Sequence, residues 1–166
     1  MSALISVVVP VYNGERDLAA CLASIGTANP VAEGAYRKIR AAVIGQEVFI
    51  THVHFGPRWN VHRERDREKL AAFDLDGKIS GHAARMIATP EETLGRPAMA
   101  ALHAIRSRIP LEFYGIDFDM LTDGRVLFFE ANAAMNLSLS DRTGLEKTRA
   151  AMRAAVRRLF EKSIAQ

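Results

Sequence analysis

The sequence predicts an α+β protein in which helices cover an antiparallel sheet. Two pairs of strand-like runs are each joined by a short turn signal, and two later segments carry apolar residues at helical spacing. The 166 residues are enough for one domain, or at most two small ones, with a sizeable core. With 49% hydrophobic and 25% charged residues, the composition excludes a wholly disordered chain.

Composition also restricts the compartment and the partners. The single cysteine, Cys21, excludes an internal disulfide and favours a reducing compartment. The longest apolar run, Ile5–Val11, is too short to cross a membrane and follows no basic segment, so we expect a cytoplasmic protein without a membrane partner. The net charge is +3, and the basic segments are residues 35–70 and 141–166. Neither is interleaved with aromatic residues, so we do not expect a nucleic-acid partner.

The first predicted element is a strand over Ile5–Val11, which is rich in β-branched residues. Asn13-Gly14 marks a turn, and apolar residues at helical spacing then predict a helix over Glu15–Ile25. Gly26–Gly34 is rich in turn-forming residues and is the best candidate for a linker. We expect the N-terminal strand to join or cap the sheet.

The first hairpin is predicted from two strand-like runs, Tyr36–Ile44 and Glu47–Phe55, which meet at Gly45-Gln46. Alternation puts three apolar side chains on one face of the first strand, Ile39, Ala41 and Val43. The opposite face carries two cations, Lys38 and Arg40. His52 and His54 share a face of the second strand, where they could bind zinc or, as we favour, line a cleft.

Helices are predicted from capping signals and apolar stripes. Thr89–Glu92 has the pattern of a capping box with proline at the first helical position. Pro97–Ile109 carries one apolar stripe, formed by Met99, Leu102, Ile105 and Ile109. Gly144–Lys162 has an arginine-rich face opposite a second stripe, formed by Leu145, Met152, Val156, Leu159 and Phe160.

The most informative stretch is Phe113–Asn132, which predicts two strands around the turn dipeptide Asp123-Gly124. If these two residues form the loop, the register of the hairpin is fixed. The resulting pairs are Thr122 with Arg125, Asp117 with Glu130, Gly115 with Asn132, Asp119 with Phe128, Phe118 with Phe129 and Ile116 with Ala131.

This register places the carboxylates of Asp117 and Glu130 opposite each other. Like charges directly opposite destabilise a sheet by up to about 1 kcal/mol, so we expect something to compensate. Magnesium would do so, because it takes oxygen ligands from one or two carboxylates together with substrate phosphates. A solvated polar face is the alternative, and a one-residue error in the turn would remove the pairing.

Asp117, Glu130 and Asn132, with Asp-Phe before the turn and Glu-Ala-Asn after it, resemble the metal-binding end of the ATP-grasp ligases. The Gly-Ile-Asp form at residues 115–117 is most similar to the ribosomal-protein glutamate ligases, in the same group as glutathione synthetase. Tyr36–Phe55 resembles the hairpin that precedes this site in the family. The resemblance covers roughly residues 35–140 and implies the C-terminal ATP-grasp subdomain.

The resemblance implies that Asp117, Glu130 and Asn132 bind Mg²⁺ bridging the phosphates of ATP, and that Lys38 and Arg40 face those phosphates. In the family, ATP activates a small carboxylate as an acyl phosphate, and an amine or thiol then displaces phosphate. The chain shows neither the glycine-rich loop nor the earlier lobe of the family. We therefore expect residues 29–166 to be a partial lobe that is not a complete enzyme alone and lacks surface that a partner lobe or a second copy would supply.

Ser6–Ile25 resembles the opening strand and helix of family 2 glycosyltransferases, which makes residues 1–28 a separate β-α segment. In that resemblance Pro10, Tyr12 and Asn13 would line the uracil side of a nucleotide, and Asp117-Phe118-Asp119 would be a metal-binding D-x-D. Three hypotheses follow, in order of preference. The chain is a partial ATP-grasp lobe, a non-catalytic remnant or oligomerising module, or a glycosyltransferase fragment.

Overall fold

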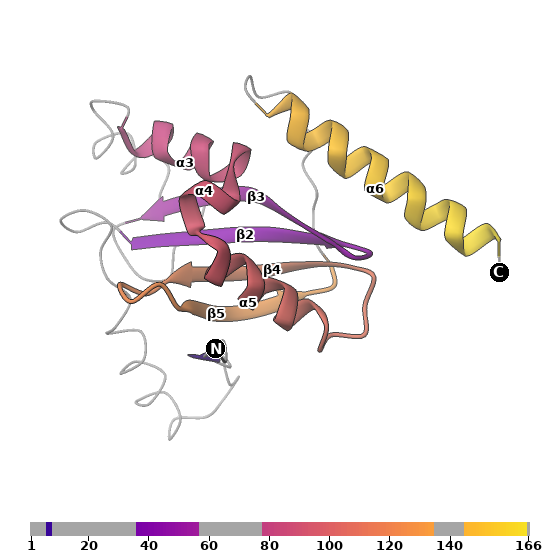
Figure 1. Cartoon of the computed structure of the whole chain (residues 1–166), viewed down its shortest axis with the longest axis horizontal. Helices are drawn as coiled ribbons and strands as arrows, with labels where there is room; N and C mark the ends of the chain where they lie inside the picture. Colours follow the sequence, from indigo (N-terminus) through magenta and orange to yellow (C-terminus); the bar gives the residue numbers. More distant parts are fainter. Residues whose placement is uncertain (1–5, 8–35, 57–77, 135–144, 166) are drawn as a thin grey trace.

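The structure is a computed structural model that describes residues 6–7, 36–56, 78–134 and 145–165. Within these ranges five strands form one sheet in the order β1-β5-β4-β2-β3 (Figure 1). Their bounds are β1 (Ser6–Val7), β2 (Tyr36–Ile44), β3 (Glu47–Gly56), β4 (Phe113–Met120) and β5 (Val126–Asn132). Neighbouring strands are antiparallel, except that β1 runs parallel to β5. The predicted α+β class is confirmed, and the N-terminal strand joins the sheet.

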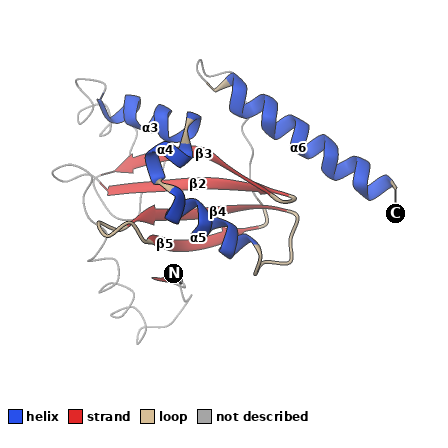
Figure 2. Ribbon diagram, in the orientation of Figure 1, coloured by secondary structure: helices blue, strands red, loops and turns tan. Residues whose placement is uncertain are grey.

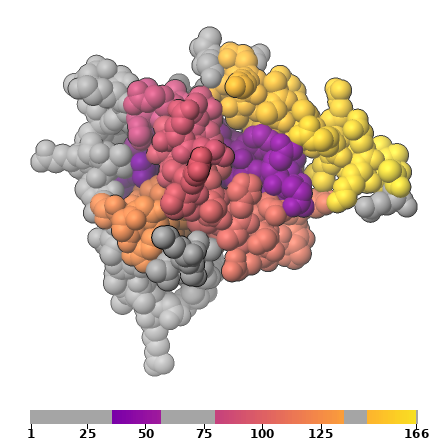
Figure 3. Space-filling model, viewed as in Figure 1, coloured from indigo at the N-terminus to yellow at the C-terminus, as the bar shows by residue number. Residues whose placement is uncertain are grey.

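Helices lie on both faces of this sheet. Their bounds are α3 (Lys78–Ala88), α4 (Pro90–Leu94), α5 (Arg96–Arg106) and α6 (Glu146–Ile164). In Figure 2, α3 lies beside β3 at the edge of the sheet, and α4 and α5 lie in front of the strands and cross the middle of the sheet. In the space-filling view α6 extends beyond the rest of the described chain, with the hairpin of β2 and β3 visible between α6 and the other helices (Figure 3).

The main core lies between the sheet and α3–α5. Apolar residues of β2 and β4 alternate onto this face and meet the predicted stripe of α5. The central members are Ile39, Val43, Met99, Leu102, Ile105, Ile116 and Phe118. Leu102, Ile116 and Phe118 are fully buried, so this face is a close-packed apolar layer.

The first hairpin has the predicted strands and a two-residue loop. Ile44 pairs with Glu47 across Gly45-Gln46, and Gly45 adopts a φ of 60°, which glycine tolerates at no steric cost. The register shifts by one residue further along, because Thr51 forms a bulge in β3. The Thr51 hydroxyl donates to the carbonyl oxygen of Arg40 at 3.1 Å, which fixes the bulge beside that residue.

The loop of the second hairpin differs from the prediction. It contains three residues, Thr122–Gly124, because Leu121 N–H donates to Arg125 O and Gly124 N–H donates to Leu121 O. Gly124 has a φ of 81°, as expected where a type I turn is followed by a left-handed residue. Close to the loop the register is therefore one residue away from the predicted one.

A bulge at Phe129 then restores the predicted register. The pairs Asp117–Glu130, Ile116–Ala131 and Gly115–Asn132 are those that the sequence predicts. On the loop side of the bulge the predicted pairs are wrong, because Phe118 pairs with Phe128 and Asp119 with Leu127. Two one-residue shifts thus cancel at the pair of carboxylates.

The helices bring three further corrections. Helix α3 was not predicted, although Met86 and Ile87 are buried in the core. Thr89 precedes α4 with Pro90 at its first position, but its hydroxyl donates to Arg85 O at 3.2 Å and makes no cap hydrogen bond, because α3 ends one residue earlier. Phe160 is 65% exposed, so it does not belong to the buried stripe of α6.

The predicted helix over Glu15–Ile25, the linker Gly26–Gly34, Cys21 and the nucleotide-facing residues Pro10, Tyr12 and Asn13 lie outside the described residues. None of the helices in the described ranges combines the length and the apolar character that a membrane crossing requires.

Candidate functional site

Four charged side chains gather on the sheet face that points away from α3–α5. They are Lys38, Arg40, Asp117 and Glu130, termed here the charged band. Arg40 pairs with Asp117 across β2 and β4, and Asp117 pairs with Glu130 across β4 and β5. His52 pairs with Arg40 from β3 and completes a polar row across four strands. The structure thus brings together residues that the sequence predicts from two separate hairpins.

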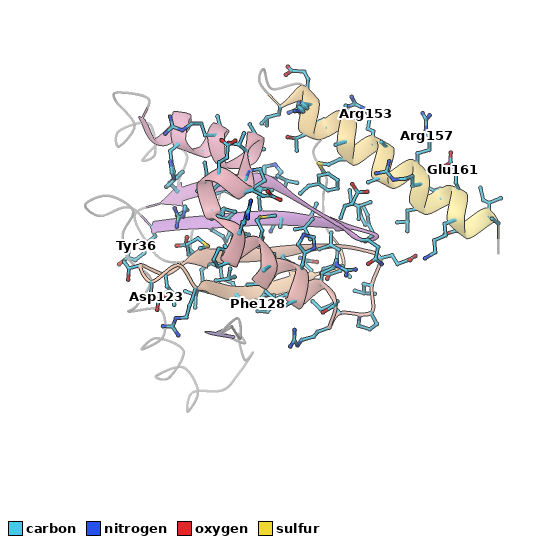
Figure 4. The ribbon with its side chains drawn as sticks, in the orientation of Figure 1. Tyr36, Asp123, Phe128, Arg153, Arg157 and Glu161 are labelled. Carbon is cyan, nitrogen blue, oxygen red and sulfur yellow. The ribbon has the colours of Figure 1, made fainter. Side chains whose placement is uncertain are left out.

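The charged band lies between two apolar clusters on the same face. At one end of β2, Tyr36 packs with Leu121, Leu127 and Phe129 near the loop of the second hairpin. Tyr36 is labelled close to Asp123 of this loop in Figure 4. At the other end of β2, a second cluster is formed by Ala42, Ile44, Met152 and Ala155 under α6. Apolar neighbours lower the local dielectric, which strengthens interactions between the charges of the band.

Asp117 is the centre of the charged band. Its side chain is only 3% exposed, and both carboxylate oxygens have partners. Arg40 Nε donates to Oδ1 at 2.6 Å and Arg40 Nη2 donates to Oδ2 at 2.7 Å, which is a bidentate pair. Lys38 Nζ lies 3.3 Å from Oδ2. The charge that compensates Asp117 in this structure therefore comes from β2.

The pKa values of Asp117 and Arg40 follow from this contact. Burial alone would raise the pKa of Asp117, but the Arg40 hydrogen bonds and the charges of Lys38 and Arg40 outweigh it and lower the pKa. The hydrogen bond to Asp117 raises the pKa of Arg40, with a smaller contribution from the charge of Glu130. Both groups of this pair are charged at neutral pH.

Asp119, the second carboxylate of the D-x-D interpretation, belongs to a different ion pair. It is 2% exposed, accepts from Arg37 Nε at 2.6 Å and accepts from the backbone N–H of Met120 at 2.7 Å. Burial raises the pKa of Asp119 and is only partly offset by the charge and hydrogen bond of Arg37. Asp117 and Asp119 are thus held by separate cations.

Glu130 and Asn132 lie at the exposed side of the site. Both residues are exposed on β5, and the Glu130 carboxylate makes no hydrogen bond or ion pair with a described residue. Asn132 Oδ1 accepts from the backbone N–H of Ala134 at 2.8 Å, which orients the carboxamide. Because Gly115 lies opposite Asn132, the carboxamide has no side chain across from it in the pair.

The donor set has the chemistry that a magnesium ion requires. Asp117, Glu130 and Asn132 supply oxygen atoms only, which hard cations prefer. For Asp117 to bind a metal ion, Arg40 and Lys38 must move away from its carboxylate, because they contact both of its oxygens. Among the residues that the structure describes, no three His, Cys, Asp or Glu side chains cluster closely enough to hold a metal.

The two histidines of β3 border the charged band. The rings of His52 and His54 are stacked, with their centroids 5.5 Å apart, and they lie opposite Arg40 and Lys38 in the register. His52 Nδ1 is 3.1 Å from Thr51 Oγ1, so the bulge residue also orients this ring. The expectation that they line a cleft stays a prediction.

The contact of Arg37 with Asp119 was not predicted from the sequence. The two residues are 82 positions apart, and only the pairing of β2 with β4 brings them together. One feature of the sequence could have indicated this contact. Tyr36–Arg40 contains a third cation, Arg37, in addition to the two whose face was predicted.

Comparison with models of protein families, with curated proteins and with solved structures finds no match to this chain. The resemblances to ATP-grasp ligases and to family 2 glycosyltransferases therefore stay predictions.

Proposed function

We propose that the charged band binds Mg²⁺ together with the phosphates of ATP, and that the chain is a partial ATP-grasp lobe from a ligase that joins a carboxylate to an amine or thiol. The observation that carries the proposal is the location of all five predicted residues on three neighbouring strands of one sheet. Lys38 and Arg40 come from β2, Asp117 from β4, and Glu130 and Asn132 from β5.

In this proposal each residue has a role that its surroundings support. Asp117, Glu130 and Asn132 hold the metal ion, which neutralises phosphate charge when bound. Lys38 and Arg40, which are 23% and 28% exposed, bind phosphate oxygens from the side of β2. The apolar clusters at both ends of the band lower the local dielectric and strengthen these contacts.

Calorimetric titration of the full chain with a non-hydrolysable ATP analogue and Mg²⁺ tests the proposal. We expect saturable binding that requires Mg²⁺ and that is weakened at least about 10-fold by Glu130→Ala. Glu130 is the right position because it is exposed and its removal leaves no buried partner behind. The matched control is Asp123→Ala, which removes an exposed carboxylate from the loop of the same hairpin.

Two results would contradict the proposal. Equal binding by the Glu130→Ala and Asp123→Ala variants would place the nucleotide elsewhere. Binding of UDP with Mn²⁺, in the absence of any binding of the ATP analogue, would instead favour the glycosyltransferase interpretation.

A second candidate, an oligomerising module, is favoured by the exposed apolar side chains of the described residues. They are Leu111, Phe113, Phe160 and Ile164, with 37% to 85% of each exposed. The Lys162–Glu112 ion pair, at 3.0 Å, joins the two segments that carry them. Sedimentation velocity of the Phe160→Ser, Ile164→Ser double variant tests this candidate, because loss of a dimer would support association of two copies through α6.

A further inference from the structure

The carboxylate of Asp117 has no free oxygen for a metal ion in this structure. Arg40 engages both oxygens, at 2.6 and 2.7 Å, and Lys38 Nζ lies 3.3 Å from Oδ2. The carboxylate is almost fully buried, so water cannot replace a lost partner without a large cost. A metal ion that approaches Asp117 therefore meets two cations that already contact both of its oxygens, and their repulsion opposes metal binding until they move away.

The two cations, in turn, are held by Asp117 and are not free to bind an anion. Lys38 and Arg40 are the residues proposed to bind phosphate, and both are occupied by Asp117. If an anion alone drew them away, a buried carboxylate would remain without a partner. If a metal ion alone displaced them, two half-buried cations would remain without one. Breaking a buried ion pair from either side is costly, because it leaves a buried charge without a partner, whereas an exchange of both sets of partners at once leaves none of the charges unpaired.

We infer that Lys38 and Arg40 form an exchangeable clamp on Asp117, which couples the binding of a divalent cation to the binding of phosphate. The inference rests on the proposed function and adds its regulation. In the unliganded chain the clamp keeps the site closed to either ligand alone. With both ligands present, Asp117 turns from the cations to the metal ion, and Lys38 and Arg40 turn from Asp117 to phosphate oxygens.

This coupling has a measurable size and is reciprocal. A coupling of ordinary magnitude changes affinity by about 5- to 150-fold, and phosphate must strengthen metal binding by the same factor by which the metal strengthens phosphate binding. A metal ion that itself binds phosphate also couples the two ligands, so the coupling factor alone does not identify the clamp. The clamp predicts in addition that removal of Arg40 strengthens the binding of the metal ion in the absence of phosphate, which an ordinary metal site with an unpaired Asp117 does not predict.

The test uses Mn²⁺ as the probe for the cation and inorganic phosphate as the probe for the anion. Bound Mn²⁺ is measured by electron paramagnetic resonance on the full chain, with and without phosphate. For the wild type we expect weak Mn²⁺ binding that phosphate strengthens at least about 10-fold. In Arg40→Gln we expect Mn²⁺ alone to bind at least about 10-fold more tightly than to the wild type, and phosphate to strengthen Mn²⁺ binding less than it does in the wild type.

Arg125→Gln is the matched control, because Arg125 Nε also lies 2.6 Å from an aspartate oxygen in an ion pair, but that pair with Asp123 is exposed. This variant should bind Mn²⁺ as the wild type does. Lys38→Gln removes the longer contact and should raise the affinity for Mn²⁺ alone by less than Arg40→Gln does.

A measurement on the wild type alone keeps the test independent of whether Arg40→Gln folds. The Arg40 Nε–H resonance in a ¹⁵N-edited spectrum reports its hydrogen bond to Asp117. We expect Mg²⁺ alone and phosphate alone to leave the resonance in place, and both together to shift it.

The outcomes distinguish the clamp from the proposed function. Tight Mn²⁺ binding to the wild type without phosphate, or a shift of the Arg40 resonance by Mg²⁺ alone, would overturn the clamp while leaving a metal site. Absence of Mn²⁺ binding to the wild type and to a folded Arg40→Gln variant, with or without phosphate, would overturn both.

Discussion

The two faces of the sheet are built from the same strands but are stabilised in different ways. Towards α3–α5, β2 and β4 present Ile39, Ile116 and Phe118, all fully buried among apolar neighbours. On the opposite face the same strands present Arg40 and Asp117, which are joined by a bidentate ion pair. On the first face, burial of apolar surface stabilises the folded state. On the second face, the attraction within the ion pair is offset by the cost of removing its charges from water. The first face stabilises the fold, and the second carries the site proposed to bind Mg²⁺ and phosphate.

The largest expected effect is on the apolar face. Phe118→Ala should lower the free energy of unfolding by about 3–5 kcal/mol, because it removes a fully buried ring and leaves a cavity. Urea denaturation measures this loss. Phe160→Ala is the control, since that ring is 65% exposed and its removal should change stability by less than about 0.5 kcal/mol. Equal losses in the two variants would contradict the assignment of the core.

The next effect sharpens the comparison on the charged face. Arg40→Met should cost at most about 3 kcal/mol, because Asp117 stays buried with only Lys38 as its partner. The double variant Arg40→Met, Asp117→Leu should recover most of that loss, since an apolar pair of similar volume often replaces a buried ion pair without cost. Denaturation of both variants tests this, and a double variant as unstable as the single one would show that the pair itself is favourable.

A smaller effect is expected in the loop of the second hairpin. Gly124→Ala should destabilise the protein by about 1–2 kcal/mol, because a residue with a side chain is strained at a φ of 81°. The space around Gly124 is open, so the cost is conformational and not steric crowding by neighbours. Thermal unfolding would show it, and Gly124→Asn should lose less, since asparagine tolerates this conformation. Equal losses for the two variants would argue against a left-handed residue there.

The smallest expected effect is a pH dependence of the free energy of unfolding, which has opposite signs for the two buried aspartates, Asp117 and Asp119. The lowered pKa of Asp117 means that its charged form stabilises the fold above the ordinary value of 3.8, and that this contribution is lost as the pH falls through the lowered pKa. The raised pKa of Asp119 means that its charged form costs stability, increasingly as the pH rises from 3.8 through the raised pKa.

Unfolding free energies of Asp117→Asn and Asp119→Asn across acidic pH test these signs. The deficit of Asp117→Asn relative to the wild type should shrink as the pH falls below 3.8. Asp119→Asn should gain on the wild type as the pH rises above 3.8. Profiles of the same sign for both variants would show that the two ion pairs are equivalent.

The pairing of Asp117 with Glu130 was predicted from a two-residue turn, which is one residue shorter than the observed loop. The pair is nevertheless in the predicted register, because the bulge at Phe129 offsets the extra loop residue. The alternation within each strand was predictable because it depends on the local backbone only. A bulge is decided by how the two strands pack, so its position could not be derived from the turn.

The sequence by itself determined the local features of this protein. The bounds of β2, the two-residue loop at Gly45 and the apolar stripe of α5 follow from periods and turn preferences that act within a few residues. The cation face of β2 and the acidic face of the second hairpin follow from the same alternation.

The tertiary structure alone decided how these faces meet. The strand order places β4 between β2 and β5, which brings Arg40 to Asp117 from 77 positions away and Arg37 to Asp119 from 82. The neighbouring strand also supplies positive charge to Asp117, which the local pattern did not indicate, while the metal ion expected at the paired carboxylates stays a prediction. Strand order depends on the summed packing of distant segments, and no local pattern of residues records it.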